Sequence, residues 1–306
     1  MRAGVSARTG GVSAGGYESL NMGFLSGDDR ESVLENRRRA MRAFLAAGRD
    51  GETGGSPPGG VDSGVREEAH GRLSNDILSR WVGVKQVHAA NVLVADETHA
   101  GSGALSPIIG GPGGPAVEAD AICTATRGLV LTIQVADCVP VAVYDAGNNA
   151  LGVAHCGWRG TAGHVLIRLL EHMGGEFGTI AKNVYAGIGP GICGGCLEVG
   201  GDVARHFVGP EYEGYRVLWD APKNTDDAEN NIGVPPVDDE SDIAHADPKY
   251  RVNIWAALHA QLTNSGVPHP HIETMVTCSM ESPDILFSHR RDGAKCGRNA
   301  LFAMIV

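Results

Sequence analysis

The feature that most constrains this chain is a set of three potential metal ligands that stand far apart in the sequence. Apolar, strand-like runs give way to polar residues at His88, Cys138 and His155. Side chains at the ends of strands can converge in space although their positions in the sequence are distant. Two imidazoles and one thiolate form a zinc site with three protein ligands, whose fourth position stays open for water or substrate. This arrangement is typical of a catalytic metal, so we predict an enzyme.

Helical and strand-like patterns mix along the whole chain. A helix is expected from about Glu31 to Ala47, and three strands are expected between Ala119 and Ala154. A further helix, capped by Thr161, is expected to follow these strands. We therefore predict the α/β class (α+β mixed), with mixed β-sheets flanked by helices.

The length of the chain favours one domain. A sizeable core fits within 306 residues, and the sequence contains no internal repeat. Two polar segments are expected to be flexible surface loops, a Gly/Pro/Ser-rich one at 49–75 and an acidic one at 221–249. We predict a single domain over residues 1–306 that includes both loops.

Composition excludes several classes of function. The net charge of −11 argues against a nucleic-acid-binding protein, which normally carries a basic stripe. No apolar run approaches the roughly 18 residues that a membrane-spanning helix needs, and the N-terminus lacks the apolar core of a signal peptide. The seven cysteines lack the spacing of a disulfide scaffold, which indicates reduced thiols. We expect a cytoplasmic monomer or homodimer that binds neither nucleic acid nor membrane.

Polar residues beside the three ligands extend the candidate site. Asp137 directly precedes Cys138 and can orient a ligand or accept a proton. Arg159 follows His155 in a glycine-flanked turn, where its planar fork suits a phosphate or carboxylate, although a surface salt bridge is an equal alternative. Near the C-terminus, His289 and Arg290 belong to a dense polar cluster that can meet an anionic substrate or pair with acidic side chains.

A second cysteine motif, Cys193-x-x-Cys196, lies in a glycine-rich stretch. A structural zinc site normally needs a second pair of ligands at suitable spacing, and the sequence has no second pair of cysteines of this kind. We therefore interpret this motif as a turn that carries two thiols, and not as a metal site.

Ten short segments, in the same order along most of the chain, match the pattern of a known family. They are Arg8-Thr-Gly-Gly-Val-Ser, Ser19-Leu-Asn-Met-Gly, Gly27-Asp-Asp, Lys85-Gln-Val-His, Glu118-Ala-Asp-Ala, Ala136-Asp-Cys-Val-Pro, Ala154-His-Cys-Gly-Trp-Arg-Gly, Gly187-Ile-Gly-Pro, Leu197-Glu-Val-Gly and Phe287-Ser-His-Arg-Arg-Asp-Gly. Through them the chain resembles the YfiH-like family, whose members are called laccase-domain proteins, polyphenol oxidoreductases or multifunctional purine nucleoside phosphorylases.

The resemblance implies a zinc ion held by the positions that match His88, Cys138 and His155. It also implies a zinc-dependent enzyme that phosphorolyses adenosine, inosine and methylthioadenosine and deaminates adenosine, with purine nucleosides and phosphate as its partners. An older label for the family implies copper and polyphenol oxidation instead. Residues proposed for the reaction are Asp137 and Arg159 as catalytic groups, and Arg8, Asn21, Gln86 and Arg290 for substrate or phosphate binding.

The sequence departs from the family pattern in a few places. Only seven residues precede Arg8, where the family has an opening strand. Cys193 and Gly195 stand where the family usually has Gly and Cys, and Leu258 replaces an expected Asn. None of these positions is one of the three ligands.

Three alternatives to a zinc nucleoside enzyme stay open. His₂Cys is also the equatorial ligand set of a blue-copper site, but a multicopper oxidase needs many paired histidines, and the 12 histidines here include one His-x-His. A metal-free hydrolase could use Cys138 as nucleophile and His155 as base, which leaves His88 without a role. A non-catalytic protein with a structural metal is disfavoured by the open coordination position, because structural zinc sites are closed.

Overall fold

The computed structural model describes residues 1–47, 77–105, 116–220 and 249–306. Its helices are α1 (Arg30–Ala46), α3 (Trp158–Ala162), α4 (Val165–Phe177), α5 (Gly201–Ala204), α6 (Ile254–Asn264) and α7 (His289–Asp292). Its strands are β1 (Arg2–Val5), β2 (Trp81–Gly83), β3 (Val92–Val94), β4 (Ala121–Thr124), β5 (Val130–Val135), β6 (Val139–Asp145), β7 (Ala150–Cys156), β8 (Val184–Ile188), β9 (Glu198–Gly200), β10 (Leu218–Asp220), β11 (Lys249–Val252), β12 (Ile272–Thr274) and β13 (Asn299–Met304).

The strands form three sheets. A four-stranded sheet has the order β1-β13-β5-β2, a six-stranded sheet has the order β12-β8-β6-β7-β4-β3, and β10-β11-β9 form a small third sheet. In the four-stranded sheet, β5 pairs parallel with β2 and antiparallel with β13. In the six-stranded sheet, β8 pairs parallel with β12 and antiparallel with β6. The predicted class, α/β with mixed sheets, is therefore confirmed.

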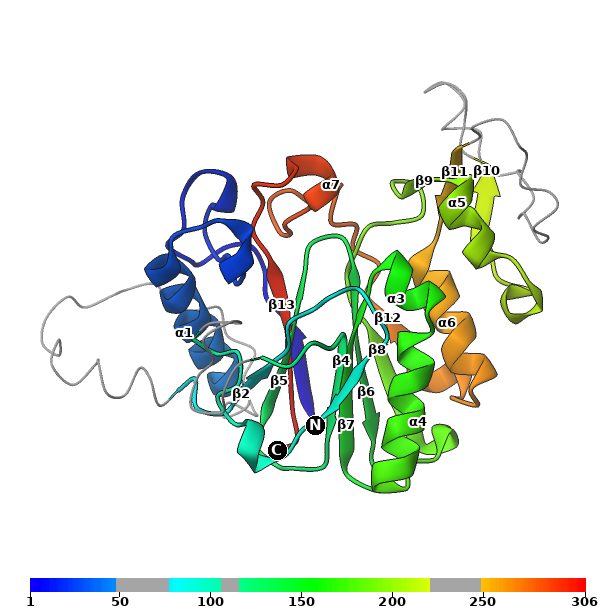
Figure 1. The fold of residues 1–306 in the computed structure, drawn as a ribbon, viewed down its shortest axis with the longest axis horizontal. Coiled ribbons are helices and arrows are strands. Elements are labelled where there is room, and N and C mark those ends of the chain that lie inside the picture. The colour runs from blue at the N-terminus through cyan, green and yellow to red at the C-terminus, as the bar shows by residue number, and fades with distance from the viewer. Residues whose placement is uncertain (48–76, 106–115, 221–248) are drawn as a thin grey trace, which may run out of the picture.

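The four- and six-stranded sheets pack face to face, and helices cover their outer faces (Figure 1). Leu131 and Ile133 of β5 meet Leu151 and Val153 of β7 in the core between the sheets. Burial of such side chains contributes about 1.5–3 kcal/mol each, so this shared core holds the two sheets together.

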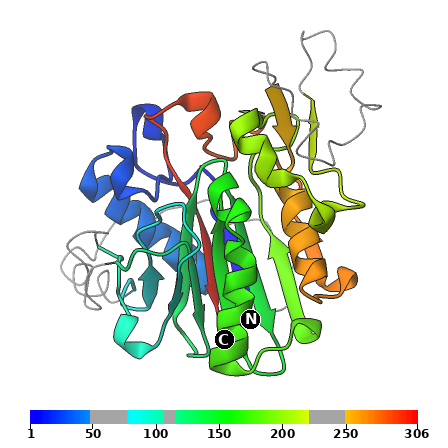
Figure 2. The same ribbon diagram turned by 45° about the vertical axis from the view of Figure 1, so that its right-hand side comes forward.

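Each outer face has its own helix layer. Met41 of α1 packs with Trp81 and Phe302 on the four-stranded sheet. On the six-stranded sheet, Leu169 and Met173 of α4 belong to the buried stripe that helical periodicity predicts. Figure 2 shows α4 and α6 on one side of the sheets and α1 on the other.

The structure corrects two details of the predicted elements. Four strands, not three, lie between Ala119 and Ala154, because the apolar run ending at Cys138 is broken by a turn in which Asp137 has a φ of +81°. The helix predicted to be capped by Thr161 is two helices, α3 and α4, since His164 adopts a left-handed conformation between them. The turn at Asp137 contains no Gly or Pro that would mark it in the sequence, whereas the break between α3 and α4 contains Gly163.

The ends of the chain lie together. β1 pairs antiparallel with β13, so an opening strand is present although few residues precede Arg8. The loops predicted at 49–75 and 221–249 fall outside the described residues, apart from Lys249, which begins β11. That residues 1–306 form one domain stays a prediction. Among the described helices, none has the length and apolarity needed to span a membrane.

Candidate metal centre

His88, Cys138 and His155 converge at one end of the two packed sheets. Their ligand atoms all lie within 4.8 Å of one another, and the two imidazole rings are 4.8 Å apart between centroids. His155 lies near the end of β7, Cys138 occupies the turn that crosses from β5 to β6, and His88 lies in the loop after β2. The crossing between sheets is what brings a thiol from one strand end to an imidazole from another.

Asp120, directly before β4, organises two of the three ligands. Its buried carboxylate accepts hydrogen bonds from the backbone N–H groups of Val87, His88 and Ala89, at 3.2, 3.0 and 2.7 Å. It also lies 2.8 Å from Nδ1 of His155. A carboxylate at Nδ1 fixes the tautomer of a histidine and leaves Nε2 free for a metal, as in carboxylate–histidine–zinc triads.

Gly157 lets the chain pass close to the thiol. A Cβ at this position would lie 2.8 Å from the Cys138 sulfur and 3.4 Å from the His88 ring. Any other residue would therefore push into the space between two ligands. The lack of space beside the two ligands therefore explains why the first residue of the Gly-Trp-Arg-Gly segment is a glycine.

The electrostatics of the cluster favour a thiolate. Burial alone would raise the pKa of Cys138, but the adjacent imidazoles of His155 and His88 lower it to about 6. Burial alone would lower the pKa of His155, but the Cys138 thiolate and Asp120 raise it to about 9. Cys156, which lies next to the site, has a raised pKa because it is buried, so it stays a neutral thiol.

The donor set fits a zinc ion. Thiolate and imidazole are the donors that zinc prefers, and the separation of the three atoms is compatible with one ion bound by all of them. Three protein ligands leave one position of a tetrahedron open. His88, Cys138 and His155 all line a cavity of about 520 Å³, which is within the range of small-molecule sites.

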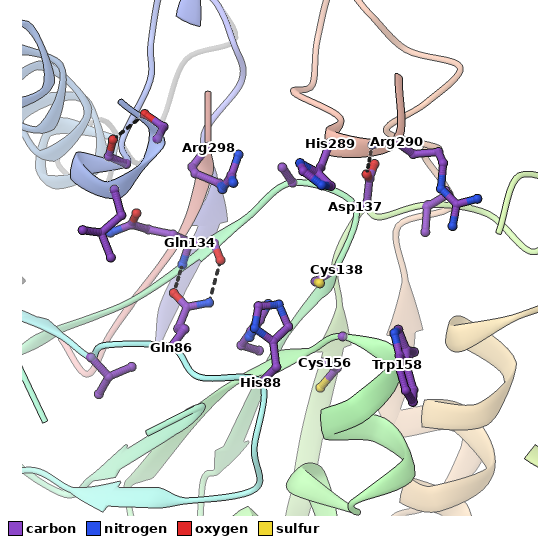
Figure 3. A pocket seen from close by; sticks show the side chains of 18 of the residues that line it. Gln86, His88, Gln134, Asp137, Cys138, Cys156, Trp158, His289, Arg290 and Arg298 are labelled. Carbon is purple, nitrogen blue, oxygen red and sulfur yellow. Dashed lines mark hydrogen bonds between the residues drawn. The ribbon is translucent and has the colours of Figure 1, made fainter. Parts of the chain in front are cut away.

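The cavity carries the guanidinium of Arg298 and the imidazole of His289 opposite the candidate metal ligands. Figure 3 draws His289 and Arg298 along one side of the cavity and His88 along the other, and all three line it. Nη1 of Arg298 donates to the backbone oxygens of Cys296 and Gly297, while its other guanidinium nitrogens have no partner among the described residues. An anionic group in the cavity would meet these free donors.

Of the six residues predicted from the sequence for catalysis or substrate binding, three line this cavity: Gln86, Asp137 and Arg290. Gln86 pairs with both backbone groups of Gln134, at 2.7 and 2.8 Å. The Asp137 carboxylate accepts from Ser279 Oγ and from the Arg290 backbone N–H, both at 2.6 Å. The Arg290 guanidinium donates to the Glu198 backbone oxygen at 3.2 Å.

The other three predicted residues are not among those that line the cavity. Arg8 donates to the Pro283 backbone oxygen at 3.1 Å. Asn21 is fully buried and accepts from the Arg298 backbone N–H at 2.9 Å, so it supports the segment that carries that arginine. Arg159 is exposed and stacks on Trp158 at 4.3 Å, while Trp158 itself lines the cavity.

Sequence reasoning assigned no role to Asp120 or Arg298. Asp120 lies in a segment that matched the family pattern, and this was the available signal for it. Arg298 had no such signal, because its position in the cavity follows from the pairing of β13 with β5.

Comparison with known proteins places these features in a family. The family model described as "Multi-copper polyphenol oxidoreductase laccase" matches residues 2–50 and 65–306. A purine nucleoside phosphorylase, YlmD of Geobacillus stearothermophilus, is 29% identical over 98% of this chain and 88% of its own length. The crystal structure of YlmD from the same species superposes with a TM-score of 0.74, at 27% identity, over 99% of this chain and 91% of that one. An adenosine deaminase, RL5, from an unknown prokaryotic organism is 30% identical over 58% of this chain and 59% of its own length.

The lowered pKa of Cys138 predicts its reactivity in protein freed of metal. Because the thiolate is the nucleophile, the rate at which iodoacetamide alkylates Cys138 should be half maximal near pH 6. At lower pH the rate should decrease further. Peptide mass spectrometry across a pH series measures the rate, with buried Cys156 as the unreactive internal control. A midpoint near 9, the ordinary value for a thiol, would contradict the thiolate–imidazole geometry.

Proposed function

The chain belongs to the family of multi-copper polyphenol oxidoreductase laccases, and from that premise we propose that it is a zinc-dependent purine nucleoside enzyme. The proposed reactions are phosphorolysis of adenosine, inosine and methylthioadenosine, and deamination of adenosine. The observation that carries the proposal is a three-ligand metal centre whose open side faces a cavity with free cationic donors. The names of the relatives YlmD and RL5 support both reaction types.

The proposed metal ligands are His88, Cys138 and His155. When bound, zinc supplies Lewis-acid stabilisation of the negative charge that develops during either reaction. Asp120 keeps His155 in the tautomer that presents Nε2, and it holds the loop of His88 through three backbone hydrogen bonds. The residues of the chain therefore orient the ligands before any substrate arrives.

The anion that phosphorolysis needs is proposed to bind at Arg298, His289 and Arg290. Phosphate carries its charge on several oxygens, and an arginine can contact two of them with its planar fork. Nε and Nη2 of Arg298 are the donors available for this contact. Their position across the cavity from His88 would hold the phosphate beside a nucleoside that is bound near the metal.

The nucleoside is proposed to lie between the metal centre and the apolar wall of the cavity. Phe24 and Trp158 line the cavity and offer rings on which a purine can stack. Arg159 is proposed to act through Trp158, on which its guanidinium lies. Gln86, whose side chain is held by two hydrogen bonds to the backbone of Gln134, would form another part of the cavity wall.

Asp137 is the proposed acid–base group. Each of its carboxylate oxygens accepts one hydrogen bond, from Ser279 and from the Arg290 backbone, so a further lone pair on each oxygen is available to a proton in the cavity. Arg8 and Asn21 are proposed to contribute indirectly, Arg8 through its bond to the Pro283 segment and Asn21 through Arg298. The proposal includes a cytoplasmic monomer or homodimer whose cysteines are reduced.

The copper alternative has less support from the site. Within the described ranges, the second group of potential metal ligands contains cysteines and a glutamate and no histidine. A trinuclear copper cluster built from paired histidines thus has no counterpart in that part of the chain.

A metal-free cysteine hydrolase is the second candidate function. The pKa of Cys138 is lowered to about 6 and that of His155 is raised to about 9. These two shifts favour a thiolate at Cys138 and an imidazolium at His155. A chelator separates the two candidates, because it should abolish a zinc enzyme and spare a thiol hydrolase.

The main test measures metal content and nucleoside turnover in the same preparations. Wild-type protein should convert adenosine to adenine only with phosphate present and to inosine without it. Cys138→Ala should lower both rates at least about a hundredfold, since several kcal/mol of charge stabilisation is lost with the metal. Cys123→Ala, which changes a buried cysteine outside the site, is the matched control and should retain activity. Wild-type protein that binds zinc at these ligands and turns over no nucleoside would contradict the proposal.

A second test concerns the phosphate contact. Arg298→Met should raise the KM for phosphate about 10- to 100-fold, the effect of losing one or two charge-assisted hydrogen bonds. Deamination, which uses no phosphate, should change less than about threefold. The control is Lys85→Met, because Lys85 also lines the cavity but is paired with Glu118 at 2.7 Å. An unchanged KM for phosphate in Arg298→Met would rule out this contact.

A further inference from the structure

A second cluster of metal-binding side chains lies outside the centre described above. Cys193, Cys196, Cys278 and Glu281 bring their ligand atoms within 4.8 Å of one another. A Glu281 carboxylate oxygen lies 3.2 Å from the sulfur of Cys196 and 3.8 Å from that of Cys193. The backbone N–H of Cys193 donates to the Cys278 sulfur at 3.4 Å.

The two halves of the cluster come from distant segments that the backbone holds together. Cys193 and Cys196 stand on a turn between β8 and β9, in which the Cys196 N–H donates to the Cys193 carbonyl at 3.0 Å. Cys278 follows β12 and forms a β-bridge with Gly191. The bridge uses bonds on both sides, from Gly191 N to the Thr277 oxygen at 3.3 Å and from Ser279 N to the Gly191 oxygen at 2.9 Å.

The folded arrangement supplies the second pair of ligands that the sequence did not show. Cys278 and Glu281 have the same spacing as Cys193 and Cys196, so the four residues form a Cys-x-x-Cys and Cys-x-x-Glu set. Two such pairs, one on each of two adjacent turns, are the ligand pattern of structural zinc sites. Here a carboxylate takes the position that a fourth cysteine usually holds.

The chemistry of the donors favours zinc in a closed site. With Zn–S bonds of about 2.3 Å, tetrahedral ligands lie roughly 3.8 Å apart, which the observed cluster accommodates with small side-chain movements. Four protein donors leave no position for substrate. A Cys193–Cys196 disulfide is the competing use of these thiols, but it would leave Cys278 and Glu281 without a role.

We propose that Cys193, Cys196, Cys278 and Glu281 bind a second, structural zinc ion. Binding replaces the protons of three thiols, so three thiols, one carboxylate and Zn²⁺ give the bound site and three released protons. This proposal concerns a ligand set separate from that of the proposed catalytic metal, and it stands or falls independently of nucleoside chemistry.

The position of the site gives it a structural role at the wall of the cavity. Ile192 and Leu197, which flank the cysteine turn, line the cavity. Ile192 N donates to the Asp137 carbonyl at 2.8 Å, and Ser279 Oγ donates to the Asp137 carboxylate at 2.6 Å. A zinc ion that joins the two turns would thus hold Ile192 and Ser279, two of the hydrogen-bond partners of Asp137, in place.

The test counts metal ions per chain after reconstitution of reduced protein with zinc and removal of loosely bound ions. Wild type should retain two zinc ions, and Cys193→Ser and Cys138→Ala should each retain one. Cys123→Ala, a buried cysteine outside both clusters, should retain two. The same number of ions in Cys193→Ser as in wild type would overturn the proposal. Failure of the three-ligand centre alone would appear as an unchanged count in Cys138→Ala.

A measurement on the wild-type chain keeps the proposal testable if a variant does not fold. Iodoacetamide should leave Cys193, Cys196 and Cys278 unmodified in the zinc-loaded protein and modify Cys193 and Cys196 once a chelator is added. Cobalt substituted into Cys138→Ala should show sulfur-to-metal charge-transfer absorption. Modification of Cys193 and Cys196 at the same rate with and without zinc would overturn the proposal. A Cys193–Cys196 disulfide in protein purified under reducing conditions would also overturn it.

Discussion

The candidate metal centre depends on the buried carboxylate of Asp120. This one side chain accepts three backbone N–H groups from the segment Val87–Ala89 and contacts Nδ1 of His155. Its own backbone oxygen accepts from the His155 N–H at 2.7 Å. A buried carboxylate is costly unless it is paired and hydrogen-bonded, and here the bonds that satisfy it are those that place two ligands. The hydrogen bonds that stabilise the buried charge are therefore the same bonds that position His88 and His155.

The second constraint is the packing of two mixed sheets. β5 belongs to one sheet and β6 to the other, so the turn between them must cross the interface, and it carries Cys138 across. Gln86 fixes the neighbouring loop by bonding both backbone groups of Gln134 beyond the β2–β5 pairing. The ligands thus stand on loops anchored to a shared core, which suits a site that must be rigid before substrate binds.

The sequence was sufficient to predict the mixed α/β class and to single out three donors that the fold brings together. Thiol and imidazole groups at the ends of apolar runs are visible in a linear pattern. Roles that arise from pairing between distant segments are not visible in this way. Asp120 acts on residues about 30 positions away, and Glu281 completes a ligand set only because Gly191 bridges to Cys278. The turn at Asp137 was hidden because it lacks glycine and proline.

The most direct test of this account is the zinc dissociation constant of Asp120→Asn, measured by competition with a chromogenic chelator. An asparagine keeps one oxygen that can accept the backbone N–H groups of Val87 and Ala89. The atom that faces Nδ1 of His155 and the His88 N–H becomes an amide, which donates to Nδ1 and thereby favours the wrong tautomer. We predict about 10- to 100-fold weaker zinc binding at the His88–Cys138–His155 centre. Asp145→Asn, at another buried aspartate, should bind zinc as wild type does. Unchanged affinity in Asp120→Asn would contradict the central place given to this carboxylate.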